Sequence, residues 1–262
     1  MYGIPAPDRP IDSDRTCLDS SSVACEKHMS FSRLWNWVMR NLPQRGGRAM
    51  PICPELSDAR RCLKAQKYRE SLNAALPYCE SNDRHFRREA NRIAGLARFQ
   101  MGLFPEAFAS LKIAAEDSQY AGDWLNVALS ATMAGEIALG SRAFAIAIRS
   151  WETPGSSNSP GIGFMRQWYA CALRDRQEFG LAFEQISVLR FMYEQFRVTD
   201  PTFLHMRGMP FLQDTTRVAV DVLKALGPSI DALGWINDFA AKLDVEGQRC
   251  LDNARLQLRC DT

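Results

Sequence analysis

Side chains that commonly do chemistry are few and scattered in this sequence. The histidines are His28, His85 and His205, and none belongs to a local motif with Ser, Cys or Asp. The sequence contains no P-loop, no dinucleotide-binding GxGxxG, no HExxH and no GxSxG. A catalytic site needs polar groups that converge with matched pKa values. We therefore expect a protein that is not an enzyme, with no catalytic residues and no cofactor.

The eight cysteines indicate neither a metal site nor a disulfide scaffold. They form no CxxC, and no Cys–His cluster has zinc-ligand spacing. Cys62, Cys79 and Cys171 fall inside apolar helical patterns, where a free cysteine behaves as a small hydrophobic residue. Cys250 and Cys260 leave open a cross-link near the C-terminus. This usage predicts no bound metal and a reducing, cytoplasmic location.

The sequence shows no targeting signal that contradicts the predicted cytoplasmic location. No apolar run reaches the roughly 18 residues of a transmembrane helix. The first residues lack the basic region and apolar core of a secretory signal, although secretion by a signal-less route stays open.

Basic residues gather in one part of the chain. Arg84, Arg88 and Arg92 recur every four residues on one predicted helical face, and the nearby sequence adds further cations: Arg60, Arg61, Lys64, Lys67, Arg87 and Arg98. Such a stripe is typical of a solvated helix face, but it could also hold an acidic protein segment or a phosphate backbone. A net charge of only +2 ranks an acidic protein ahead of nucleic acid.

The elements that position these residues follow a repeat. Residues 88–118 read as two helices joined by a tight turn at Gly102, and the second helix has an apolar stripe with helical spacing. The landmarks recur 33 residues later: Gly102 as Gly135, Ala107 as Gly140, Leu111 as Phe144 and Ala114 as Ala147. Four equal offsets indicate internal duplication. Weaker units flank these two, with Gln66 and Gln177 in place of the turn glycine.

Because no alternating β pattern or hairpin signal occurs, the predicted fold class is all-α. The pattern of small residue, glycine, aromatic, alanine and large apolar residue resembles the tetratricopeptide repeat, a helix–turn–helix unit of about 34 residues. The resemblance covers residues 54–196. It implies an α-solenoid whose concave groove, lined by the first helix of each unit, binds an extended peptide or a partner helix.

The resemblance also implies which residues face the groove. They are Arg60 and Lys64 in the first unit, Arg88, Arg92, Leu96 and Phe99 in the second, Leu125, Leu129 and Met133 in the third, and Gln167, Cys171 and Arg174 in the fourth. Repeat proteins that clamp a terminal carboxylate place Lys and Asn at positions that here mostly hold Leu96, Leu125, Leu129 and Gln167. Only Asn126 fits, so we do not expect that clamp.

Three regions follow. Residues 1–50 are an N-terminal tail, expected to be disordered except for one short amphipathic helix at 31–42. Residues 51–196 form the repeat array, and residues 197–262 form a C-terminal loop, over 197–214, and capping helices.

The predicted function is that of a bacterial-type scaffold, adaptor or chaperone-like protein that binds a peptide or helix with acidic and apolar residues. The alternative is a regulator whose basic face binds nucleic acid or an anionic surface, and an enzyme with a site at the groove and the 197–214 loop is a third. A homo-oligomer also stays open. If the groove binds the partner, Leu129→Asp should abolish capture without changing helicity.

Overall fold

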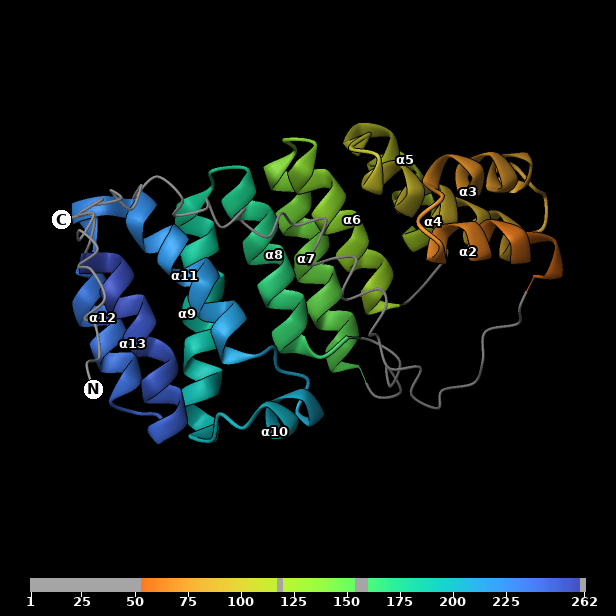
Figure 1. Cartoon of the computed structure of the whole chain (residues 1–262). Helices are drawn as coiled ribbons and strands as arrows, with labels where there is room; N and C mark the ends of the chain where they lie inside the picture. The colour runs from red at the N-terminus through yellow and green to blue at the C-terminus, as the bar shows by residue number, and fades with distance from the viewer. Residues whose placement is uncertain (1–52, 117–119, 154–159, 260–262) are drawn as a thin grey trace, which may run out of the picture.

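The computed structural model describes residues 53–116, 120–153 and 160–259. These residues form twelve α-helices and three short 3-10 helices, and none of them lies in a strand (Figure 1). The all-α prediction is therefore confirmed for this part of the chain. The predicted tail at 1–50, with its helix at 31–42, lies outside the described residues. Within the described part, no helix combines the length and apolar content needed to cross a bilayer.

The helices follow one another in pairs. The first four pairs are α2 (Ser57–Lys64) with α3 (Tyr68–Ala75), α4 (Arg84–Gln100) with α5 (Phe104–Glu116), α6 (Ala121–Met133) with α7 (Ile137–Glu152), and α8 (Ile162–Asp175) with α9 (Phe179–Phe196). The remainder comprises α10 (Pro201–Met206), α11 (Leu212–Leu226), α12 (Ala232–Ala240) and α13 (Val245–Arg259). Short 3-10 helices stand at Pro54–Leu56, Leu76–Tyr78 and Gly227–Ser229.

The packing is mostly between sequence neighbours. Within each pair the two helices pack together, and the first helices also form a row in which α2 contacts α4, α4 contacts α6 and α6 contacts α8. Helix α11 extends this row, because it packs on both α8 and α9 and pairs with α13. Figure 1 shows the succession running from α2 and α3 to α12 and α13. We call α2, α4, α6 and α8 the first helices.

The turn inside each of the four pairs has the same geometry. Gln66, Gly102, Gly135 and Gln177 have φ angles of 61°, 78°, 90° and 63°. In each turn the next residue donates its backbone N–H to the carbonyl five residues earlier at 2.9 Å, as Leu103 does to Arg98 and Glu178 to Leu173. This is the Schellman arrangement that ends many helices. The two glutamines thus adopt the left-handed conformation that glycine takes in the other two turns.

Because a side chain disfavours this conformation, Gln177→Gly is expected to stabilise the protein. The left-handed region costs an L-residue about 1–2 kcal/mol, and the extra freedom of glycine in the unfolded chain offsets part of that. We expect a gain of about 0.5–1 kcal/mol in the free energy of unfolding, measured by urea denaturation. Gly102→Ala is the matched control, because an added Cβ there meets nothing within 4 Å and only the backbone penalty remains. This account would be contradicted if Gln177→Gly and Gly102→Ala changed the free energy of unfolding by the same amount in the same direction.

Close approach of helices depends on small residues. A Cβ on Gly95 in α4 would lie 2.6 Å from Leu111 Cγ in α5. A Cβ on Gly140 in α7 would lie 2.2 Å from Thr132 Oγ1 in α6. Both glycines therefore hold the two helices of their pair closer than alanine would allow.

The segment 197–214 differs from the predicted loop because part of it forms helix α10 and its last residues begin helix α11. Asp200 caps this helix by accepting the Phe203 N–H at 2.8 Å, and Pro201 occupies its first turn. Asp followed by Pro is favourable at a helix start as well as disruptive inside a helix, so the pair begins an element here.

The chain that enters α8 passes close to the chain that leaves α10. A Cβ on Gly161 would lie 2.3 Å from the backbone of Gly208, so this approach requires glycine at position 161.

Candidate functional site

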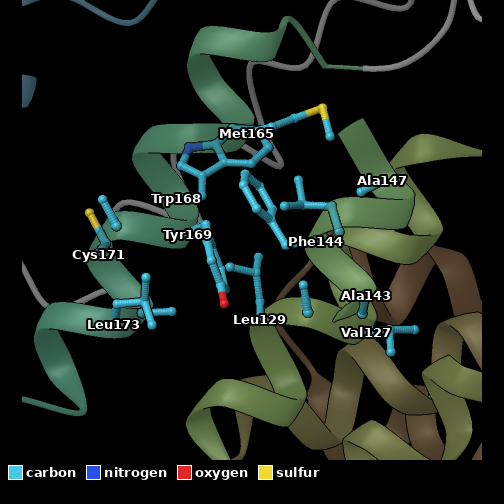
Figure 2. Close-up of a cluster of buried hydrophobic side chains, with 14 of the residues drawn as sticks. Val127, Leu129, Ala143, Phe144, Ala147, Met165, Trp168, Tyr169, Cys171 and Leu173 are labelled. Atoms are coloured by element: carbon cyan, nitrogen blue, oxygen red, sulfur yellow. The ribbon is translucent and has the colours of Figure 1, made fainter. Parts of the chain in front are cut away.

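The predicted groove residues lie on the first helices, and six of them are buried. Leu96 and Phe99 on α4 are 7% and 6% exposed, Leu125 and Leu129 on α6 are each 1% exposed, and Gln167 on α8 is 2% exposed. Cys171 is also buried. The family resemblance implied that these side chains face a partner. In this structure they are instead contacts within the core. Figure 2 shows Leu129 among the buried apolar side chains of α6, α7 and α8.

Gln167 has a structural partner. Its Oε1 lies 2.8 Å from the hydroxyl of Thr215, which in turn lies 2.9 Å from the hydroxyl of Tyr193. Tyr193 donates to the carbonyl of Pro210 at 2.9 Å, and burial raises the pKa of its phenol. These contacts connect α8, α9 and α11 through satisfied polar groups.

The space between the buried residues is narrow. The gap between α4, α5 and α6 that is lined by Leu96, Phe99, Leu111, Asn126 and Leu129 has no room even for a water molecule. It is therefore a packing feature rather than a pocket for a ligand.

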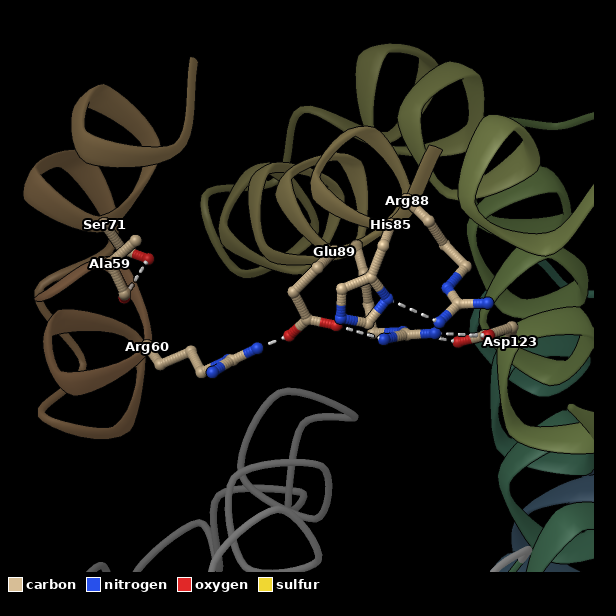
Figure 3. A network of polar contacts seen from close by, with 8 residues as sticks. Ala59, Arg60, Ser71, His85, Arg88, Glu89 and Asp123 are labelled. Atoms are coloured by element: carbon tan, nitrogen blue, oxygen red, sulfur yellow. Dashed lines mark hydrogen bonds and ion pairs between the residues drawn. The ribbon is translucent and has the colours of Figure 1, made fainter. Parts of the chain in front are cut away.

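Two cations of the basic region, Arg60 and Arg92, belong to an ion-pair network across three first helices. Arg92 on α4 donates from Nε and Nη2 to both carboxylate oxygens of Asp123 on α6, each at 2.7 Å. Its Nη1 bonds Glu89, whose other oxygen accepts from Arg60 Nε on α2 at 2.9 Å. Figure 3 shows this chain of contacts bridging α2, α4 and α6. We call Arg60, Glu89, Arg92 and Asp123 the first-helix network.

Burial and charge act in opposite directions on Arg92. Burial alone would lower its pKa, but the hydrogen bonds and charges of Asp123 and Glu89 raise the pKa above its ordinary value. The Arg92, Glu89 and Asp123 side chains are only 14%, 10% and 6% exposed. Arg92 is thus an internal structural cation in this structure, not one free to meet an external anion.

The remaining predicted groove residues differ in how far solvent reaches them. Lys64 on α2 is exposed, and Arg88 on α4 is partly exposed with its Nη2 lying 3.1 Å from His85 Nδ1. Arg174 on α8 donates to Asp221 at 2.9 Å and to Asp175 at 2.8 Å, and its side chain is 14% exposed. Met133, at the end of α6, is partly exposed.

The two carboxylates that organise this region, those of Glu89 and Asp123, were not among the residues predicted from the sequence. The offset of 33 residues does place Asp123 on the next first helix, close to the position equivalent to Arg92. That signal could have suggested the pairing, but only together with the knowledge that first helices pack on one another.

No cluster of three or more His, Cys, Asp or Glu within the described part of the chain could hold a metal ion. Burial raises the pKa of the Cys171 thiol to about 12 and also raises those of Cys53, Cys79 and Cys250. Raised thiol pKa values disfavour the thiolate, so these cysteines are poor nucleophiles at neutral pH.

No protein-family model, curated protein or solved structure matches this chain in comparisons of sequence and structure. The fold and the site define it as an all-helical protein whose helices pack in sequential pairs.

Proposed function

We propose that this chain is a tetratricopeptide-like helical array that binds a segment of another protein and acts as a scaffold, adaptor or chaperone-like protein. The main support is the repeated pairing of helices through one type of turn, with the first helices in a continuous row. Such a row gives a long, rigid surface built from several units, which suits an extended peptide or a helix.

The residues available for binding are those of the first helices that solvent reaches. We define the first-helix surface as Arg60, Lys64, Arg88, Asn126 and Met133, all of which are exposed or partly exposed. Lys64 and Arg88 favour acidic side chains, whereas Met133 adapts to apolar ones. The buried leucines beneath this surface support it without contacting the partner. The proposed partner is therefore a segment with both acidic and apolar residues.

The nucleic-acid alternative loses support from the first-helix network. Arg60 and Arg92 bind Glu89 and Asp123, so the predicted stripe includes two carboxylates. A phosphate backbone would meet these negative charges, which weaken the counterion release on which such binding depends.

Site-specific cross-linking tests the first-helix surface. The full chain would carry the photo-reactive residue benzoylphenylalanine at Met133, and in a control at Ile113 on α5, which is 41% exposed. In lysate from the native cell we expect a discrete cross-linked protein from position 133 and little from position 113. The cross-link should persist at high salt, because apolar contacts are not screened.

Two results would contradict the proposal: equal cross-linking from both positions, or loss of all products at high salt. Cross-links only to further copies of the same chain would instead indicate a homo-oligomer. The first-helix surface would then be an interface between copies and not a binding site for another protein.

A further inference from the structure

The outward face of α9 carries two exposed apolar side chains. Phe191 is 60% exposed, and Val188, one turn earlier, is 37% exposed. Every other Phe, Tyr and Trp in the described ranges is buried or only partly exposed. Phe191 is thus the described aromatic residue that would gain most from being covered by another molecule.

These two residues belong to a longer stripe on the helix. We define the α9 stripe as Glu184, Val188, Phe191 and Gln195, all of which are exposed. The buried residues of α9 are Ala182, Ile186, Leu189 and Tyr193. At about 100° per residue, the α9 stripe lies on the side of the helix opposite to those buried residues. Its spacing of four, three and four residues is that of a coiled-coil seam, so a second helix fits along it.

The α9 stripe is complementary to itself when two copies of the helix run antiparallel. Val188 of one copy then faces Phe191 of the other, and Glu184 of one copy faces Gln195 of the other. Each pairing occurs twice, because a two-fold axis relates the copies. The outer pairing is favourable, since the amide of Gln195 can donate a hydrogen bond to the carboxylate of Glu184. A parallel pairing would instead place the two Glu184 carboxylates against each other.

We propose that this chain forms an antiparallel homodimer through the α9 stripe, with Phe191 as the central apolar contact. Four residues from each copy bury less than the roughly 1,200 Å² of a standard interface, so the dimer is a transient one that dissociates in the micromolar range or above. The residues of the first-helix surface lie on α2, α4 and α6. The dimer therefore does not depend on the proposed function, and either proposal can fail alone.

Sedimentation equilibrium of the full chain under reducing conditions tests the dimer. From about 5 to 500 μM we expect the average mass to rise from that of a monomer toward twice that value. Phe191→Glu removes both central contacts and should weaken the dimer about a hundredfold or more. Ile113→Glu is the matched control on α5, where Ile113 is 41% exposed, and it should leave the dimer unchanged.

Phe191 is exposed in the single chain, so Phe191→Glu should not disturb the fold. Its melting temperature, measured at a concentration where the original chain is a monomer, should stay within about 3 °C of the original.

Exchanging the charges tests the antiparallel register. Gln195→Glu places two carboxylates opposite each other at both ends of the interface and should weaken the dimer about tenfold at low salt. Adding Glu184→Lys to that variant creates an ion pair at each end and should restore the dimer. Positions 184 and 195 lie about 16 Å apart along one helix, so contact within a single chain cannot produce this recovery.

Three results would overturn the proposal. The first is a constant monomer mass up to about 500 μM, even if benzoylphenylalanine at position 191 cross-links to a different protein or within its own chain. The second is a dimer that Phe191→Glu leaves intact, which would place the contact on another surface. The third is a dimer that the charge exchange fails to restore.

Discussion

Leu129→Asp is expected to unfold much of the array instead of removing a binding contact. Leu129 is 1% exposed and belongs to the largest apolar cluster, which extends from α4 to α11. The substitution removes a core side chain and buries a carboxylate among apolar groups without a partner. We expect a loss of about 4 kcal/mol or more in the free energy of unfolding, measured by urea denaturation followed by circular dichroism.

Met133→Asp is the matched control, because it places the same charge one turn later on α6 at a partly exposed position. This variant should lose less than about 1 kcal/mol of stability, since a carboxylate there remains hydrated. Under the proposed function it should also reduce partner capture. If Leu129→Asp instead unfolds at the same urea concentration as the original chain, Leu129 is not a core residue in solution and the packing of α4 against α6 must differ.

Asp123→Ala is expected to produce the second large effect. It leaves the Arg92 guanidinium, which is 14% exposed, without the carboxylate that binds two of its nitrogens. Removing one partner of a buried ion pair typically costs about 3–5 kcal/mol, because the other charge stays desolvated. Since Glu89 still binds Nη1 of Arg92, we expect a loss toward the lower end of that range. The free energy of unfolding in urea measures this loss. Because α4 and α6 each contribute one partner, we also expect faster amide hydrogen exchange in α4 and α6.

The double variant Arg92→Leu with Asp123→Leu tests the origin of that loss. It removes both charges and leaves Glu89 paired with Arg60, so most of the lost stability should return. Asp58→Ala is the exposed comparison, since the Asp58 and Arg61 side chains are 72% and 77% exposed and such pairs contribute little. A loss in Asp123→Ala no greater than that in Asp58→Ala would mean that the first-helix network does not hold α4 to α6.

Much of the helical architecture was predictable because its signals are local. The apolar stripe of α5 and the 33-residue offset between Gly102 and Gly135 depend on residues a few turns apart or on direct repetition. Even the degenerate turns were recognisable, since Gln66 and Gln177 stand where the pattern requires glycine and adopt the same positive φ. Helix α10 was missed because Asp200-Pro201 supports either a helix start or a break, and only the surrounding chain decides between them.

The candidate site was less predictable. Family resemblance placed Leu96, Leu129 and Gln167 toward a groove, whereas the structure buries all three. Their spacing fixes the side of the helix on which they lie. It does not fix how far the neighbouring helices cover that side.

The sequence by itself therefore determined most of the helices, their pairing and the turns between them, because backbone hydrogen bonding and helical periodicity act over short stretches of chain. Only the tertiary structure decided which charges remain free and which apolar side chains meet solvent. Arg92 and Asp123 are 31 residues apart, and their bond exists because α4 and α6 pack side by side. Burial and charge pairing are properties of such contacts, and contacts between distant residues form only when the whole chain has folded.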